Sequence, residues 1–355
     1  MRHGSRIHSM RIRYSEQIPD VAGHNWHELY LQLRSQLRAE GCFEPASFSA
    51  AINMTGTLLL LIACYALLLT DPSWIPRLLL LILVAFASVQ AGFIAHYAGH
   101  GAITRNKRRA IAIGHFFMTF LTGVIFTHFQ HKHTRHHPNC NCRVRDPDLQ
   151  TSVFLLYPGD TTPKHWAAKY ISKHQHVLLW LLVSLQGFTL KLDSLQTISS
   201  LGKAAKLEWF LLFLHVLAWL ILPMVIIGPG VAIVNYIALT WFLGPYTGSV
   251  FTVNHLGLPT FTPKESVQYM ERQLLSTRNL GDSRWSDYYF GGLNNHIEHH
   301  LFPSMSKSAL RRARPIVRQF CQQNGLPYNE TSWPDAISGV YNSLKSLSYD
   351  RTTTQ

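Results

Sequence analysis

Apolar residues in this chain gather in long runs separated by polar segments. A stretch of about 20 apolar residues can cross the roughly 30 Å hydrocarbon core of a membrane as one helix. Four runs have the required length: 48–70, 74–98, 207–227 and 231–253. A tripeptide of turn-forming residues separates the first run from the second (71–73), and another separates the third from the fourth (228–230). This pattern predicts two helical hairpins.

Two further apolar stretches are too short or too interrupted to be clear spans. The stretch at 110–129 contains His115 and His128, and the stretch at 177–190 has only about two thirds of a spanning length. We expect both to form interfacial or partly buried helices.

Charge favours one orientation of these hairpins. The proposed outer turns carry only Asp71, with Arg77 just inside a span, whereas basic residues collect on the opposite side. Positive charge marks the cytoplasmic side, so we expect both termini to lie there. The first 45 residues are polar and lack the apolar core of a signal peptide. The basic residues on the proposed cytoplasmic side are Arg105, Lys107, Arg108, Arg109, Arg143, Arg145 and the run at 307–318.

The net charge of +13 fits a face pressed against anionic lipid headgroups better than a nucleic-acid surface, because 47% of the residues are hydrophobic. We therefore predict an all-α integral membrane protein that crosses the membrane several times. It has about four transmembrane helices, interfacial helices and a cytoplasmic helical cap, which we expect to hold a dimetal site because of its histidines. The predicted divisions are a cytoplasmic N-terminal segment (1–45), a membrane domain (46–330) and a C-terminal tail (331–355).

Three clusters account for many of the 20 histidines. On a helix, residues three and four positions apart share a face, so each cluster projects its imidazoles toward one point. The predicted topology brings the clusters to the same side of the membrane, where eight rings could supply four nitrogens to each of two metal ions. The clusters are His96 and His100, then His133, His136 and His137, and finally His296, His299 and His300.

Spacing alone does not name the metal, because imidazole binds zinc, copper, nickel and iron. A structural zinc site needs only four ligands and favours thiolates. Eight neutral nitrogens therefore favour redox chemistry. The five cysteines show no paired framework, and free reduced thiols are the simpler interpretation.

The motifs around these clusters resemble those of the membrane fatty acid desaturase family. The segment 285–303 (WSDYYFGGLNNHIEHHLFP) is similar to the third histidine box of front-end and bacterial acyl-lipid desaturases, and Asp146-Pro-Asp148 is also similar to that group. The resemblance extends from about residue 85 to residue 328. Family members carry one more histidine before the third box, and His255 matches it. The implied metal ligands are His96, His100, His133, His136, His137, His255, His296, His299 and His300.

The chain departs from many front-end desaturases in two ways. Its third box begins with His296 rather than glutamine, and the HPGG motif of a fused cytochrome b5 domain does not occur in residues 1–355. The resemblance consequently leaves the position of the double bond, the chain length and the acyl carrier open, although it favours an acyl-lipid substrate.

The resemblance implies two iron ions, O2 as co-substrate and a long acyl chain lying beside the metals. No GxGxxG or P-loop pattern is present, so we expect electrons to come from a separate ferredoxin or cytochrome b5. The basic run at 307–318 could dock such a donor or contact anionic membrane lipids, and both interpretations stay open.

Metal-bound imidazoles usually donate their other N–H to an acceptor, and Glu298, Asp146 and Asp148 are candidates for that role. For the two aspartates a turn or helix cap is equally compatible. His128 and His131 could be ligands or orienting residues, whereas we expect His215 to be packed and hydrogen bonded within a span.

Three other functions are compatible with parts of this pattern. A diiron hydroxylase or ketolase of alkanes, sterols or carotenoids shares the metal chemistry and differs in its product. A membrane haem electron carrier needs histidines facing each other across spans, whereas these cluster at one edge. A zinc-dependent membrane receptor or hydrolase would contain zinc without iron.

Overall fold

The computed structural model of the protein describes residues 23–151, 153–160 and 163–349. Within them the regular structure is almost entirely helical, and β1 (Asn279–Leu280) and β2 (Glu330–Thr331) form a small parallel pair. The predicted all-α class is therefore confirmed. The ends of the predicted N-terminal segment and C-terminal tail, 1–22 and 350–355, lie outside the described residues.

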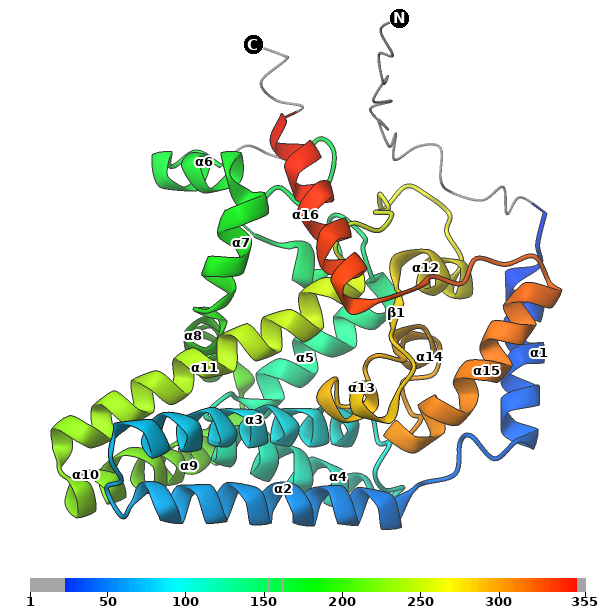
Figure 1. Ribbon diagram of the computed structural model, residues 1–355. Helices are drawn as coiled ribbons and strands as arrows, with labels where there is room; N and C mark the ends of the chain where they lie inside the picture. Colours follow the sequence, from blue (N-terminus) through cyan, green and yellow to red (C-terminus); the bar gives the residue numbers. More distant parts are fainter. Residues whose placement is uncertain (1–22, 152, 161–162, 350–355) are drawn as a thin grey trace, which may run out of the picture.

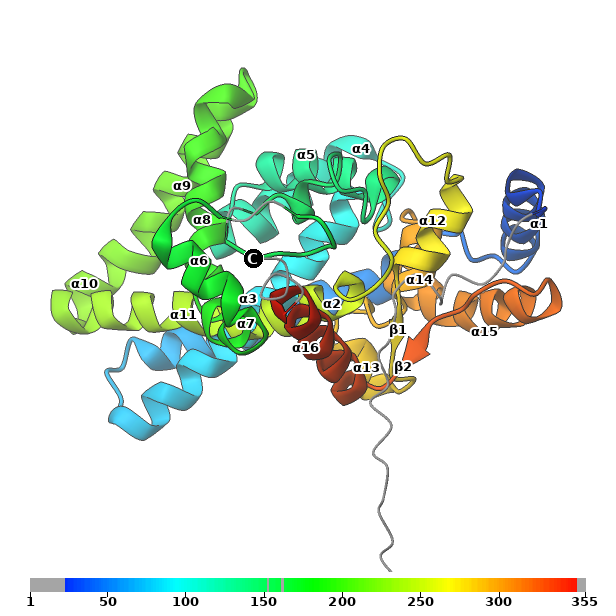
Figure 2. The same ribbon diagram turned by 90° about the horizontal axis from the view of Figure 1, so that it is seen from above.

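The long helices form two antiparallel pairs. Helix α2 (Ser47–Leu68) packs against α3 (Trp74–Gly99), and a second pair combines the continuous stretch α9 (Ala204–Val216), η6 (Leu217–Ile221) and α10 (Leu222–Ile227) with α11 (Pro229–His255). Gly228 permits the second turn because its φ of +88° lies in the left-handed region. The α2–α3 and α10–α11 turns lie at the same end of the molecule (Figures 1 and 2).

Three stretches in the described part of the chain are long and apolar enough to cross a membrane: Ser47–Leu68, Trp74–Gly99 and Ala204–Ile227. A fourth is possible if α7 (Gln175–Val183) and the stretch Gln186–Leu201, which are bent by 74° at a short break, count as one span. The latter stretch comprises α8 (Gln186–Thr197) and η5 (Ile198–Leu201). Helix α11 covers the predicted fourth run in 27 residues but is not among these spans.

The outer surfaces of α2 and of the α9–α10 stretch are strongly apolar. Large side chains such as Leu59, Phe213 and Val225 are 58–79% exposed. Contiguous exposed apolar surface of this kind is unfavourable in water and favourable in lipid. The protein is accordingly a membrane protein, with its polar chemistry gathered elsewhere.

The predicted apolar stretch at 110–129 is not one helix. It contains the end of α4 (Lys107–Gly114), the π-helical η2 (His115–Phe120) and the start of α5 (Phe126–His136). The chain turns at Gly123, whose φ is +74° and where a Cβ atom would lie 2.6 Å from His215 Nε2. Buried Glu208 then accepts hydrogen bonds from Thr127 N and Thr127 Oγ1, which fixes the first turn of α5.

A group of shorter helices lies at the opposite end of α3 from the outer turn (Figure 1). We call α1 and α12–α15 the cap. Short segments complete the chain between α5 and α8. The cap helices are α1 (Trp26–Ala39), α12 (Tyr269–Ser276), α13 (Arg284–Tyr289), α14 (His296–Leu301) and α15 (Lys307–Gln323), and the short segments are η3 (His137–Asn139), η4 (Pro147–Leu149) and α6 (Trp166–Lys173).

The predicted N-terminal segment (1–45) and the predicted C-terminal tail (331–355) each contain a helix that packs against the rest of the protein. In α1 the side chains of Leu33 and Leu37 are fully buried, and α1 contacts α12 and α15. Helix α16 (Trp333–Tyr349) lies in the predicted tail and packs against α7 and α11. The cap and α16 therefore cover the ends of α3 and α11, where the histidines lie.

Candidate metal centre

Four helical regions converge on the histidines at the cap end of the bundle. His96 lies in the last turn of α3 and His100 is its C-cap residue, while His255 ends α11. Helix α5 and the adjoining η3 carry the second cluster, and the six-residue α14 carries the third. All nine histidines predicted as ligands thus reach one region, although they span 205 residues of sequence.

Five of these rings form group I, centred on His133. The Nε2 atom of His133 lies 2.8 Å from Nε2 of His96, 2.9 Å from Nε2 of His100 and 2.9 Å from Nε2 of His137. His299 completes the group, whose five potential ligand atoms all lie within 4.8 Å of one another.

These contacts fit a metal site better than a hydrogen-bond network. A neutral imidazole nitrogen carries either one hydrogen or one lone pair, so His133 Nε2 cannot hydrogen bond to three other rings at once. Ligand nitrogens at right angles on one ion, each about 2.1 Å from it, would lie about 3 Å apart. In addition, both ring nitrogens of His299 are buried without a hydrogen-bond partner. A cation would satisfy this set of lone pairs.

The four remaining rings, His136, His255, His296 and His300, form group II. His296 Nε2 lies 2.8 Å from His255 Nε2. The ring centroids of His136 and His300 each lie 4.8 Å from the centroid of His255. His300 Nε2 is buried without a hydrogen-bond partner. Group II can therefore hold a second ion.

The two groups are direct neighbours. The rings of His137 in group I and His300 in group II are stacked with their centroids 4.3 Å apart. His136 and His137 belong to different groups although they are adjacent in sequence. The arrangement offers two adjacent candidate sites, which would divide the nine nitrogen donors five to four.

In three of the four group II rings the second ring nitrogen is held by an acceptor from elsewhere in the chain, whereas His296 Nδ1 lies 3.3 Å from Asn254 Nδ2. His136 Nδ1 lies 2.9 Å from Asp146 Oδ1, His255 Nδ1 lies 3.0 Å from the Ser276 carbonyl oxygen, and His300 Nδ1 lies 3.0 Å from Gln273 Oε1. Each acceptor fixes the hydrogen on Nδ1 and leaves the lone pair on Nε2 for a metal.

Asp146 occupies the orienting position that the sequence proposed for it. Its Oδ2 also accepts from Asn141 N at 2.8 Å, so the carboxylate closes the loop after the second histidine cluster. Asp148 is more remote, with Oδ2 3.4 Å from His136 Nδ1 and Oδ1 3.3 Å from Lys132 Nζ.

Glu298 acts on the third cluster in a different way. Its carboxylate accepts from Asn279 Nδ2 and from Tyr328 Oη, both at 2.8 Å, and its described hydrogen bonds include no histidine ring. Asn279 Oδ1 in turn accepts from Ile297 N. Glu298 therefore supports α14 from behind and is not placed to orient an imidazole directly.

Sequence reasoning missed Cys140 and Gln273. The Cys140 Sγ lies 3.3 Å from His255 Nδ1, and Gln273 links two clusters by donating from Nε2 to the His137 carbonyl oxygen while accepting from His300. The spacing from His136 to Cys140 could have indicated the cysteine. Nothing in the sequence around Gln273 indicates its role.

Three further histidines lie outside both groups. His128 Nδ1 lies 2.6 Å from Thr197 Oγ1, and His131 is exposed. His215 lies within a candidate span, with Nδ1 2.8 Å from the Phe120 carbonyl oxygen and Nε2 2.9 Å from Tyr236 Oη. His215 is thus packed and hydrogen bonded, as the sequence predicted.

Burial also sets the protonation state of four of the ligand candidates, whereas at His136 nearby carboxylates outweigh burial and raise the pKa. Removal from water, together with the charge of neighbouring imidazoles, holds the pKa of His133, His137, His299 and His300 well below the ordinary value of 6.5. These four rings are consequently neutral at physiological pH, which is the form that binds metals.

Replacing Asp146 with asparagine tests the orienting contact. Asp146→Asn removes the charge that holds the His136 N–H, and we expect metal affinity to fall about 10- to 100-fold. Metal retained during titration with a chelator measures the change. Asp148→Asn is the matched control, because that carboxylate is half exposed and farther from the ring; an equal loss in both variants would contradict a specific role for Asp146.

Comparisons with known proteins agree with this geometry. A protein-family model described as "Fatty acid desaturase" matches residues 72–332. The chain is 26% identical over 333 residues to the "Delta(8)-fatty-acid desaturase" of Helianthus annuus, which covers 89% of this chain and 72% of that relative. It is 24% identical over 329 residues to "Fatty acid desaturase 2-like protein FADS2B" of Mus musculus (90% and 66%) and 28% identical over 282 residues to "Fatty acid desaturase 3" of Bos taurus (77% and 62%).

Proposed function

This chain belongs to the fatty acid desaturase family and is an oxidoreductase, and we propose that it inserts a double bond into a long acyl chain of a membrane lipid. In this proposal O2 is the co-substrate, and two iron ions occupy groups I and II. The nine histidines of the two groups are the ligands.

The observation that carries the proposal is the convergence of Nε2 atoms around His133. Three contacts between ring nitrogens measure 2.8–2.9 Å, and buried ring nitrogens of His299 and His300 have no hydrogen-bond partner. These contacts are compatible with two adjacent metal ions and cannot all be hydrogen bonds. Iron would supply the reduction of O2 and the removal of hydrogen from an unactivated methylene. The all-nitrogen donor set is compatible with iron.

The chain itself contributes position and shelter. The backbone of α3, α5, α11 and α14 fixes the rings, and His299 and His300 are fully buried. Acceptors behind the rings, such as Asp146 and Gln273, keep the hydrogens on Nδ1. Burial under the cap excludes bulk water from the reacting centre.

We place the two groups and both termini on the cytoplasmic side. The two outer turns lie at one end of the molecule, whereas α14, which carries the third histidine cluster, and the basic helix α15 lie toward the other (Figure 1). This distribution follows the positive-inside rule.

Electrons would come from a separate ferredoxin or cytochrome b5, and the exposed part of α15 is a candidate docking face. Arg311 and Arg312 are exposed, whereas Arg314 is buried and pairs with Glu330. The basic run at 307–318 is therefore only partly available to a partner or to lipid headgroups.

The experiment is expression in a host with a simple fatty-acid profile, followed by gas chromatography–mass spectrometry of its lipids. We expect a new unsaturated acyl chain, and mapping its double bond gives the position of desaturation. Hydroxylated or keto products without a new double bond would instead assign the chain to the rival diiron oxygenase chemistry, and a Soret band in the purified protein would favour the haem alternative.

A further inference from the structure

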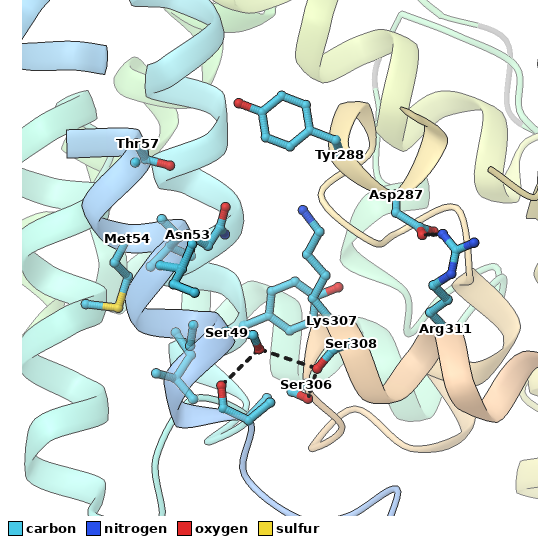
Figure 3. A pocket seen from close by; sticks show the side chains of 18 of the residues that line it. Ser49, Asn53, Met54, Thr57, Asp287, Tyr288, Ser306, Lys307, Ser308 and Arg311 are labelled. Atoms are coloured by element: carbon cyan, nitrogen blue, oxygen red, sulfur yellow. Dashed lines mark hydrogen bonds and ion pairs between the residues drawn. The ribbon is translucent and has the colours of Figure 1, made fainter. Parts of the chain in front are cut away.

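A cavity of about 610 Å³ lies between the cap end of α2 and the α13–α15 region. Its apolar wall comes from α2 and α3, including Ala50, Met54 and Ile94, and its polar wall comes from the cap. Figure 3 shows the polar side chains of Lys307 and Ser308 facing the α2 residues Ser49 and Asn53 across this space, whereas Asp287 points toward Arg311. The volume is in the range of ligand-binding pockets.

The polar wall carries an excess of positive charge. Asp287 is engaged by Arg311 and by the Asn294 amide, so its charge is already matched. Among the described residues no ion pair is formed by Arg284 or Lys307, and the Lys307 ammonium lies 5.4 Å from the centre of the Tyr288 ring. Burial lowers the pKa of Lys307 to about 8, although Asp287 opposes the shift.

Small hydroxyl groups lie beside these cations. Ser308 Oγ is 3.5 Å from Ser49 Oγ and 3.3 Å from Ser306 Oγ (Figure 3). Ser306 is also the N-cap of α15, a 17-residue helix whose positive dipole end therefore faces the cavity. Ammonium, hydroxyl and helix N-terminus together suit a phosphate group.

The cavity borders the metal centre through Tyr97. The Tyr97 side chain is 5% exposed, its hydroxyl has no hydrogen-bond partner, and its ring centroid lies 5.3 Å from that of His96. A Cβ atom at Gly292 would lie 2.7 Å from Tyr97 Oη and 2.8 Å from Lys307 Cγ. Glycine at 292 therefore lets the buried hydroxyl and the lysine approach each other within the cavity wall.

The cavity also borders a surface that faces lipid. Ile52, which lines it, is 58% exposed, and Phe48 on the same helix is 80% exposed. An occupant can enter sideways between α2 and the cap, with an apolar chain against α2 and α3 and a charged group at α15. A ligand that is amphipathic and membrane-resident matches this route.

We propose that this cavity binds the anionic phosphate headgroup of a glycerophospholipid, which makes that lipid class the acyl carrier for the reaction. The assignment rests on the proposed desaturase function. Lys307 and Arg284 contact the phosphate, the serine hydroxyls donate to it, and the unpartnered Tyr97 hydroxyl donates to a polar group of the lipid nearer the metal centre.

Native mass spectrometry of the purified full chain in mild detergent tests the site with phosphatidylglycerol as the probe and phosphatidylcholine of the same acyl chains as the comparison. We expect phosphatidylglycerol to be retained preferentially, and its binding to weaken about tenfold in the Lys307→Gln/Arg284→Gln variant. Arg312→Gln is the matched control, because Arg312 is exposed on the same helix outside the cavity. Lys307→Arg with Arg284→Lys should restore binding if charge is the cause.

Two outcomes would overturn the proposal. One is equal binding of the two lipids that is unchanged in Lys307→Gln as well as in the double variant. The other is that palmitoyl-CoA displaces phosphatidylglycerol and that the double variant no longer binds palmitoyl-CoA. Those two results together would assign the phosphate site to a coenzyme A thioester. Binding is read without turnover, so charge-dependent retention in a protein that makes no unsaturated product would contradict the desaturase function and leave the lipid site intact.

Discussion

Replacing His299 with alanine is expected to abolish formation of unsaturated acyl chains and to lower the iron content of the purified protein. The His299 side chain is fully buried, and its ring centroid lies 4.7 Å from that of His96 and 4.8 Å from that of His137. Loss of a partner behind a ligand costs up to about 100-fold in metal affinity or activity, so loss of a ligand should exceed that.

The measurement combines iron analysis with the lipid profile of the expressing host. His131→Ala is the matched control, because His131 lies beside the second cluster but is exposed and outside both groups. We expect the control to retain iron and product. Full activity in His299→Ala, or an equal loss in His131→Ala, would exclude group I as the reacting centre.

Replacing Arg314 with leucine is expected to lower the free energy of unfolding of the cap by about 2–5 kcal/mol, because each buried acceptor left without its donor costs about 1–3 kcal/mol. Arg314 is 1% exposed, and Nη1 donates to the carbonyl oxygens of Leu280 and Gly281 and to Asn295 Oδ1 at 3.0–3.2 Å, while Nη2 pairs with Glu330. One guanidinium thus joins α15 to β1, β2 and the residue that precedes α14. Leucine would leave the buried Leu280 carbonyl and Asn295 Oδ1 without this donor, whereas Glu330 keeps its contact with Arg318.

Thermal unfolding in detergent measures this effect, and a fall of about 10 °C in Tm is expected. Arg312→Leu, two residues earlier on the exposed side of α15, should change stability by less than about 0.5 kcal/mol. Because α14 carries three ligand candidates, Arg314→Leu should also release metal more readily. An unchanged Tm would contradict the role assigned to the buried arginine.

The sequence by itself determined the class of protein and the residues around which the site is built. Apolar runs predicted α2, α3 and the α9–α10 stretch, because lipid requires a long uninterrupted apolar helix. The spacing of histidines in each cluster depends only on local helix geometry, so eight of the nine candidate rings could be named without a structure. The ninth, His255, was named through the family resemblance. At 110–129 the apolar pattern indicated that the stretch is not a clear span, but it did not locate the turn at Gly123.

The tertiary structure alone decided how the clusters combine. His136 and His137 are neighbours in sequence yet belong to different groups, because each ring meets partners from other helices. The contacts of Gln273, Cys140 and Arg314 join residues that are between 16 and 136 positions apart. Such contacts depend on packing between segments that are distant in the sequence, and they produce no repeating pattern of residues. Histidine spacing on a helix and the length of an apolar run are local properties, so both can be recognised from the sequence directly.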